Sequence, residues 1–174
     1  MVKPSLLHLN EDFVYRSPKL DERYMYLVFM TMVNNLSDQS RLSRMIKHIV
    51  DNIDQVNYTV TTSGLLRELA RIEDPPEGSV NAVVEHSRKL ITKLQPNMEN
   101  FRDRDPSIIA QILGSTFDLG MLKHLLNPEV CEAIGREKKL MNPKYLLVNA
   151  DTLSTSESRH LPIFKELVDE IIEL

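Results

Sequence analysis

Hydrophobic residues recur along this chain at the spacing of an amphipathic helix, and the pattern is clearest after Ser37-Asp38. Apolar side chains there occur at i, i+3, i+4, i+7, i+8 and i+11, at Leu42, Met45, Ile46, Ile49, Val50 and Ile53. Charged residues occupy the opposite side of the same predicted helix. This spacing predicts a helix that Ser37 or Asp38 caps and that buries one face.

Further helices begin at recognisable capping residues. Asp105, Asn127 and Asn142 each precede a proline, and Asp or Asn at the N-cap followed by proline is typical of a helix start. Gly114 and Gly120 are expected to weaken or interrupt the first of these three helices. The predicted helices cover residues 21–36, 38–54, 63–73, 79–95, 106–117, 128–139 and 143–153, a short piece near 121–126, and a last helix from Pro162.

Three segments allow more than one interpretation. Residues 21–36 are apolar on nearly every side and include Tyr, Val and Phe, so a strand is the alternative, but three methionines and the capping Asp21 favour a buried helix. Residues 55–61 are β-prone and are interpreted as a loop, with the Thr61-Thr62-Ser63 cluster capping the next helix. Residues 1–18 contain Pro4 and Pro18 and are expected to form an irregular lead-in.

The apolar pattern of one predicted helix also recurs in other predicted helices. Shifted by 43, one apolar stripe falls on another: Leu65, Leu66, Leu69 and Ala70 fall on Ile108, Ile109, Ile112 and Leu113. A weaker upstream echo at a shift of 39 uses Tyr26, Leu27, Met30, Thr31 and Val33, and a downstream one uses Leu146, Leu147 and Ala150. The partner helices match at a shift of 41, where Leu42, Ile49, Val50 and Ile53 meet Val83, Leu90, Ile91 and Leu94.

Recurrence near forty residues predicts an all-α fold of three to four stacked helix hairpins, an α-solenoid-like array. This single helical-repeat domain would span residues 19–174. A helical bundle with the same helices but no repeat symmetry is the alternative.

Two stretches, ENFRDRDPSIIAQILGSTFDLGM and VNYTVTTSGLLRELARIED, resemble the repeat units of FAST-kinase-like, heptatricopeptide and octotricopeptide proteins. The shared pattern, a polar lead-in before an apolar pair, is carried by Phe101, Asp105, Ile108 and Ile109 in one copy and by Tyr58, Thr62, Leu65 and Leu66 in the other. The resemblance covers about residues 20–153 and implies an organellar RNA-binding or RNA-processing α-solenoid. HEAT repeats are a second fit through Asp105-Pro106, whereas tetratricopeptide repeats fit poorly because the chain has no Trp.

The charge distribution and the composition limit the classes of partner that the chain is expected to bind. The formal net charge of −4 resides entirely in residues 151–174, so the rest of the chain is neutral overall. A neutral body has no general attraction for polyanions, so DNA is not an expected partner, although RNA binding at a local basic patch stays possible. The longest apolar run, residues 24–33, is about half the ~20 residues of a spanning helix, and no membrane insertion is expected.

A single cysteine, Cys131, excludes an internal disulfide and favours a reducing intracellular compartment, either the cytoplasm or the mitochondrial matrix. The N-terminus resembles neither a secretory signal nor a transit peptide.

No cofactor, metal or catalytic motif emerges from the residue spacing. The five glycines form no phosphate loop, and neither a nucleophile elbow nor a paired-cysteine metal site is present. Cys131 on a helix is typical of a small buried apolar group.

The histidines recur at intervals of 38, 38 and 36 residues, at His48, His86, His124 and His160, and could stack as a metal-binding or pH-sensing ladder. The shift of 41 that aligns the apolar faces instead aligns His48 with Lys89, so coincidence is the better interpretation. We therefore expect no enzyme activity.

Two candidate interaction surfaces follow from the helical pattern. The first is a basic ridge on two equivalent helices, formed by Arg41, Arg44, Lys47, His48, Arg88, Lys89 and Lys93. Its alternative interpretation is a solvated face that binds nothing. The second is the apolar face of the acidic last helix, formed by Phe164, Leu167, Val168, Ile171 and Ile172. This helix is expected either to cap the end of the array or to dock on a partner. Met25, Met30 and Met32 are expected in the core, or at an open interface if the array is truncated.

These observations lead to the hypothesis of a non-enzymatic protein–protein interaction or assembly subunit of a larger complex. The alternative, which the family resemblance implies, is an RNA-binding helical-repeat protein of organellar RNA processing or translation.

Overall fold

Helices form every regular element that the computed structural model describes, which covers residues 5–93, 106–155 and 157–174. The α-helices are α1 Leu6–Arg16, α2 Glu22–Asn35, α3 Gln39–Asp51, α4 Thr59–Leu69, α5 Ser79–Lys93, α6 Pro106–Asp118, α7 Leu122–Leu125, α8 Pro128–Glu137, α9 Pro143–Ser154 and α10 Pro162–Ile172. Three short 3₁₀ turns connect them: η1 Ile53–Gln55, η2 Lys138–Leu140 and η3 Glu157–His160. Phe101 and Asp105, which contribute to the family resemblance, and Leu94 lie outside the described residues.

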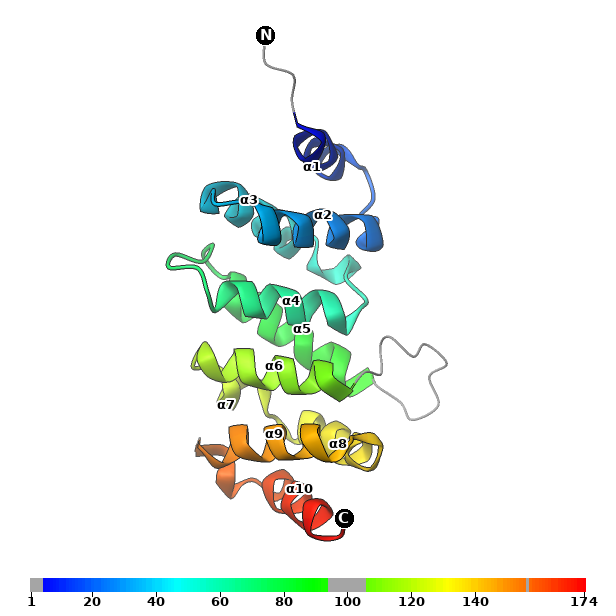
Figure 1. Cartoon of the computed structure of the whole chain (residues 1–174), viewed down its shortest axis with the longest axis vertical. Coiled ribbons are helices and arrows are strands. Elements are labelled where there is room, and N and C mark those ends of the chain that lie inside the picture. Colours follow the sequence, from blue (N-terminus) through cyan, green and yellow to red (C-terminus); the bar gives the residue numbers. More distant parts are fainter. Residues whose placement is uncertain (1–4, 94–105, 156) are drawn as a thin grey trace.

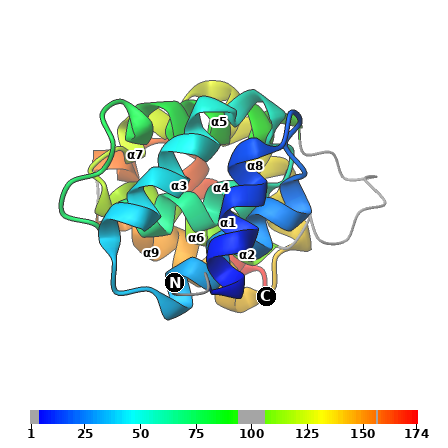
Figure 2. The same ribbon diagram turned by 90° about the horizontal axis from the view of Figure 1, so that it is seen from above.

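The helices stack in two layers along one axis. In Figure 1, α2, α4, α6 and α9 lie one beneath the next, and α3, α5 and α8 form the layer behind them. Seen from above in Figure 2, the two layers lie side by side, and α1 lies across the top of the stack. At the opposite end, α10 packs on α8 and α9. The prediction of an all-α fold of stacked helix hairpins is confirmed.

Buried side chains recur in both layers at positions i, i+3, i+4 and i+7 of a helix. Each of these residues is less than a tenth exposed. In the first layer the four positions are Met25, Val28, Phe29 and Met32 in α2, Thr62, Leu65, Leu66 and Leu69 in α4, and Leu146, Asn149, Ala150 and Leu153 in α9, with Ile108, Ile109 and Ile112 in α6. In the second layer they are Leu42, Met45, Ile46 and Ile49 in α3, Val83, His86, Ser87 and Leu90 in α5, and Val130, Ala133, Ile134 and Glu137 in α8. This spacing forms one helical stripe, which packs against the neighbouring hairpins.

The buried pattern confirms two of the predicted alignments and corrects the others. The shift of 43 between α4 and α6 aligns buried positions, except that Ala70 is an exposed C-cap residue. The shift of 41 between α3 and α5 aligns the buried Leu42 and Ile49 with Val83 and Leu90, while Val50 and Ile53 are only half-buried. The upstream echo at a shift of 39 was wrong, because Leu27 is 65% exposed and the buried face of α2 aligns with α4 at 37. The downstream echo included Leu147, which is 54% exposed.

The expectation of an irregular lead-in is also wrong. Residues 6–16 form α1, in which the Ser5 side chain caps the helix by accepting the backbone N–H of His8 at 3.2 Å. Val14 is buried and Leu7 packs on the core, so this helix is part of the packed structure. Pro4 and Pro18 flank the helix and do not prevent it, because proline is unfavourable inside a helix and tolerated outside it.

Helix α4 begins four residues earlier than predicted, because its cap comes from a distant residue. Thr61, Thr62 and Ser63 lie inside the helix and are buried. The buried Glu22 carboxylate of α2 accepts the backbone N–H groups of Asn57 at 2.7 Å and Tyr58 at 3.0 Å, and it also accepts the hydroxyl of Thr61. An anion at this position satisfies orphan amides and complements the helix dipole.

Glycines have smaller effects than expected. Gly114 lies within an uninterrupted α6, whereas Gly120 follows that helix with a φ of +67°, a backbone conformation that favours glycine.

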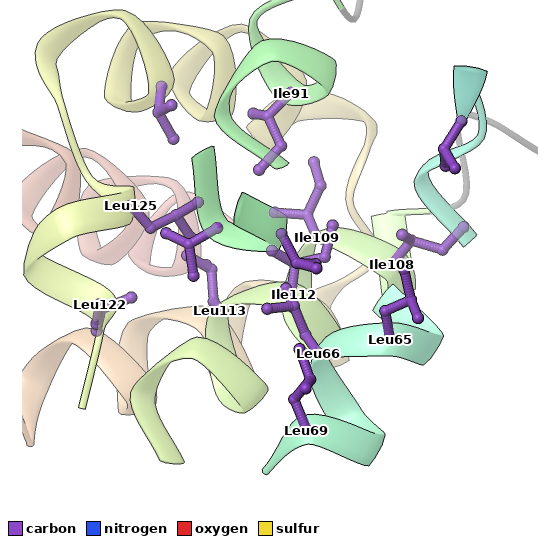
Figure 3. Close-up of a cluster of buried hydrophobic side chains, with 14 of the residues drawn as sticks. Leu65, Leu66, Leu69, Ile91, Ile108, Ile109, Ile112, Leu113, Leu122 and Leu125 are labelled. Carbon is purple, nitrogen blue, oxygen red and sulfur yellow. The ribbon is translucent and has the colours of Figure 1, made fainter. Parts of the chain in front are cut away.

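The core is continuous between the layers. Figure 3 shows Leu65, Leu66 and Leu69 of α4 beside the isoleucines of α6, with Ile91 of α5 at the upper edge of the cluster. Leu122 and Leu125 of the short helix α7 extend it. Met25 and Met32 are fully buried and Met30 is half-buried, as expected for core residues.

Truncation at the centre of this core should be costly. Leu66→Ala leaves a cavity between α4 and its neighbours, and we expect the free energy of unfolding to fall by about 2–5 kcal/mol. Leu147→Ala, on the exposed side of α9, is the matched control and should change it by less than about 0.5 kcal/mol. Urea denaturation followed by circular dichroism measures both, and equal losses would contradict the assignment of Leu66 to the core.

The long-range cap of α4 gives a second test. Glutamine has only one acceptor oxygen, so Glu22→Gln leaves one of the two backbone N–H groups facing an amide NH₂. We expect a loss of about 1–3 kcal/mol. The exposed Glu77→Gln keeps all of the described hydrogen bonds and should leave the unfolding midpoint unchanged in the same urea titration. Stability retained in Glu22→Gln would show that the cap contributes nothing.

Candidate interaction surfaces

The basic residues of α3 join α1 to the rest of the stack. Arg41 donates from Nε to Oε2 of Glu11 at 3.1 Å, and the Tyr15 hydroxyl donates to the other carboxylate oxygen at 3.2 Å. Glu11 is only 3% exposed. The Arg44 guanidinium lies 4.5 Å from the centre of the Tyr15 ring, and His48 meets the same ring edge-on at 5.1 Å. Three of the predicted ridge residues are thus used in internal contacts.

The charges in this cluster are fixed near neutral pH. Burial, reinforced by the Glu11 carboxylate, raises the pKa of Tyr15 well above its usual value, while the hydrogen bond to Glu11 raises the pKa of Arg41. Burial, with a contribution from Arg44, lowers the pKa of His48, although Asp51 opposes the shift. A neutral histidine leaves the Glu11–Arg41 ion pair as the central charged contact between α1 and α3.

The remaining ridge residues lie on α3 and α5, which pack against each other. Lys47 pairs with Asp51 at 3.0 Å, and Arg88 pairs with Glu85 at 2.7 Å, each within its own helix. Lys89 and Lys93 are exposed on α5. Four of the predicted ridge cations therefore lie on two neighbouring helices, with acids interspersed among them. A continuous ridge, and its binding of RNA or an acidic partner, stays a prediction.

The predicted docking face of α10 is largely used inside the protein. Leu167 is fully buried, and Phe164 and Ile171 pack against the core. Val168 is half-buried, and Ile172 is 76% exposed. The expectation that all five residues form one free face is wrong for Leu167, because α10 packs this stripe onto α8 and α9.

The histidines and the cysteine have structural surroundings. His86 takes the core position that aligns with Met45, and its Nε2 lies 2.7 Å from the carbonyl oxygen of Val56. Cys131 is half-buried, and burial raises the pKa of its thiol, with Glu166 adding to the shift. Among the described residues, no three His, Cys, Asp or Glu side chains are grouped as metal ligands would be.

An exposed apolar surface lies at the α1 end of the stack. Leu6, Leu9 and Phe13 of α1 are 75%, 51% and 61% exposed, and Leu27 of α2 is 65% exposed. We call these four residues the α1 end face. Two of them, Leu6 and Leu27, line a groove of about 200 Å³ between the two helices, together with Leu7, Asn10, Tyr24, Val28 and Thr31.

Sequence reasoning missed the α1 end face, although the signal was present. Leu6, Leu9 and Phe13 occur at i, i+3 and i+7 behind the capping Ser5, which is the spacing of one helix face. Interpreting residues 1–18 as irregular removed that periodicity from consideration. Burial of Val14 and Leu7 on the inner side makes α1 apolar on two sides.

A more polar cleft of about 440 Å³ lies where the α1–α2 and α3–α4 connections meet, lined by Lys19, Leu20, Asp21, Glu22, Arg23, Gln55, Asn57 and Tyr58. Its acids already accept backbone N–H groups: Asp21 from Tyr24, and Glu22 from Asn57 and Tyr58. Arg23 lies 6.0 Å from the centre of the Tyr58 ring. The two carboxylates of the cleft, Asp21 and Glu22, are therefore already hydrogen-bonded to backbone N–H groups. With the exposed cations Lys19 and Arg23, they give the cleft no net charge.

No protein-family model, curated protein or solved structure matches this chain. Over the described ranges, none of the helices combines the length and apolar character that crossing a lipid bilayer requires.

Removal of the central cation in the α1–α3 cluster should detach α1. Arg41→Met leaves the buried Glu11 carboxylate without its counter-charge, and we expect a loss of about 2–4 kcal/mol in the free energy of unfolding. Lys47→Met breaks the exposed pair with Asp51 and should cost less than about 0.5 kcal/mol.

The double variant Glu11→Gln with Arg41→Met separates the charge effect from loss of packing. It should be more stable than Arg41→Met alone, because no unpaired charge stays buried. Thermal denaturation at neutral pH measures the double variant beside each single variant, Glu11→Gln and Arg41→Met. If the double variant loses as much as the two single changes combined, Glu11 and Arg41 act independently.

Proposed function

We propose that this chain is a non-enzymatic assembly subunit that binds a protein partner through the α1 end face. The observation that carries the proposal is the row of four large apolar side chains, each more than half exposed, on two neighbouring helices at one end of the stack. Contiguous exposed apolar patches on soluble domains mark interaction sites, whereas scattered single residues do not.

The surface is suited to binding because it is already ordered. Phe13 is held edge-on against Tyr24 with ring centres 5.4 Å apart, and the backbone of both helices is fixed by packing. Little conformational entropy is therefore lost when a partner covers it. Burial of a large apolar side chain contributes about 1.5–3 kcal/mol, scaled by the fraction that becomes covered. Four such side chains supply a binding core that rim contacts extend.

RNA binding is the competing function, and it would use the basic ridge. Lys89 and Lys93 are the ridge residues that face solvent without a partner in the described hydrogen bonds and ion pairs. Two exposed lysines give a short electrostatic footprint, and the ridge lacks the interleaved aromatic side chains on which bases stack. The apolar end face therefore supports a protein partner more strongly than an RNA partner.

The test is a pull-down of the intact tagged chain from its native extract, with and without RNase. We expect partners that survive RNase and that are lost in the end-face variant Leu9→Glu with Phe13→Glu. Leu147→Glu adds the same charge at an exposed leucine of α9 and should keep the partners. Circular dichroism and a thermal melt establish that all variants are folded.

Two results would contradict the proposal. Partners retained by the end-face variant would place the binding surface elsewhere. Partners lost on RNase treatment would favour RNA binding, and Lys89→Glu with Lys93→Glu should then abolish capture.

A further inference from the structure

We infer that the partner at the α1 end face is a second copy of this chain, which packs α1 against α1 about a two-fold axis. The inference rests on the proposed function and deepens it, because it assigns the occupant of the same surface. Three properties of the surface support it: complementary shape, complementary hydrogen-bonding groups and sufficient area.

The end face carries both a projecting side chain and a groove that can receive it. Phe13 is 61% exposed at one end of α1, and Leu6 lines the groove at the other end. Seven residues separate them, about 10 Å along the helix. When two α1 helices pack antiparallel, Phe13 of each copy lies opposite Leu6 and the groove of the other. A two-fold contact of this kind is made twice, and each copy needs only the surface that it already has.

The polar groups beside the apolar row are also self-complementary. His8 and Asp12 lie 3.8 Å apart on α1, with side chains 51% and 39% exposed. The same antiparallel arrangement places His8 of one copy near Asp12 of the other, so an imidazole donor and a carboxylate acceptor meet at both ends of the contact.

The area is in the range of a stable dimer. The exposed fractions of the four end-face side chains amount to about two and a half fully exposed large side chains, on the order of 400–500 Å² of apolar surface. Because non-polar atoms make up slightly more than half of a typical interface, the full contact covers roughly 700–850 Å² per copy. A standard protein–protein interface buries about 800 Å² per partner.

The other end of the stack opposes self-association. Its exposed surface on α10 includes Ile172, but Asp169 and Glu173 are exposed beside it. Two copies that meet there bring like charges together, which disfavours contact. Pairing through the α1 end gives a closed two-fold dimer, because both copies use the same end of the stack.

Sedimentation velocity of the full-length chain over a concentration series tests the inference directly. We expect a species of twice the 20.1 kDa chain mass. In Phe13→Glu the dissociation constant of this dimer should rise at least about tenfold, so that the monomer predominates. Leu147→Glu should leave the dimer unchanged. A chain that stays monomeric at all concentrations, or a dimer that Phe13→Glu does not affect, would overturn the inference.

The antiparallel arrangement has two tests of its own. His8→Glu should weaken the dimer by placing acid opposite Asp12 of the second copy, and adding Asp12→Lys should restore it. In a Cys131→Ser background, Leu9→Cys lies near the two-fold axis and should form a disulfide-linked dimer under mild oxidation, whereas Val148→Cys on α9 should not. Absence of both the rescue and the crosslink would exclude this geometry.

The inference and the proposed function fail in different ways. If the chain is monomeric but loses an extract partner in Leu9→Glu with Phe13→Glu, the proposed function holds and the dimer is excluded. If the end-face variants change neither self-association nor the capture of partners from the extract, the dimer and the proposed function are both wrong.

Discussion

The structure depends on the burial of one four-residue stripe on each stacked helix, because every hairpin must cover the hairpin before it and the one after it. Where the stripe includes polar residues, local bonds accommodate some of them: Ser87 donates to the carbonyl of Val83 at 2.7 Å, and His86 contacts the carbonyl of Val56. Other members keep a buried polar atom without a described partner, as at Asn149 and Glu137. The stripe thus tolerates polarity that it does not always satisfy, because apolar contacts on both sides dominate its energy.

Stacking by this stripe makes the two ends of the array differ from its middle. At one end, α10 packs Ile163 and Leu167 onto α8 and α9, and its exposed Ile172 is flanked by the acids Asp169 and Glu173. At the other, α1 is joined to α3 by a buried ion pair and to α2 by Leu7 and Val14, which leaves its outer side unused. An outer side that carried polar residues would simply end the stack. Leucine and phenylalanine there make the same position a binding surface.

The sequence predicted the elements whose determinants are local. Residues 39–51 have strong periodicity and the adjacent cap Asp38, so the start of α3 was predicted to within one residue, whereas its end at Asp51 was placed three residues too late. α4 was placed too late because its N-terminal amides are satisfied by Glu22, some 35 residues upstream. The register of α2 was misjudged because a helix that is apolar on nearly every side gives no periodic signal of which side is buried. Burial of that helix was predictable, but its orientation depended on the neighbours on both sides.

The candidate surfaces follow the same division between local and distant determinants. The sequence shows that α3 is rich in cations, but the function of each cation is decided by its partner. Arg41 binds Glu11, 30 residues away in a helix that was not expected, while Lys47 binds Asp51 within its own helix. A charged residue is available to a ligand only when no such partner claims it, and an apolar residue is available only when no neighbouring helix covers it. Both conditions are properties of the packed stack, which is why its uncovered end, and not its charge pattern, indicates where this protein binds.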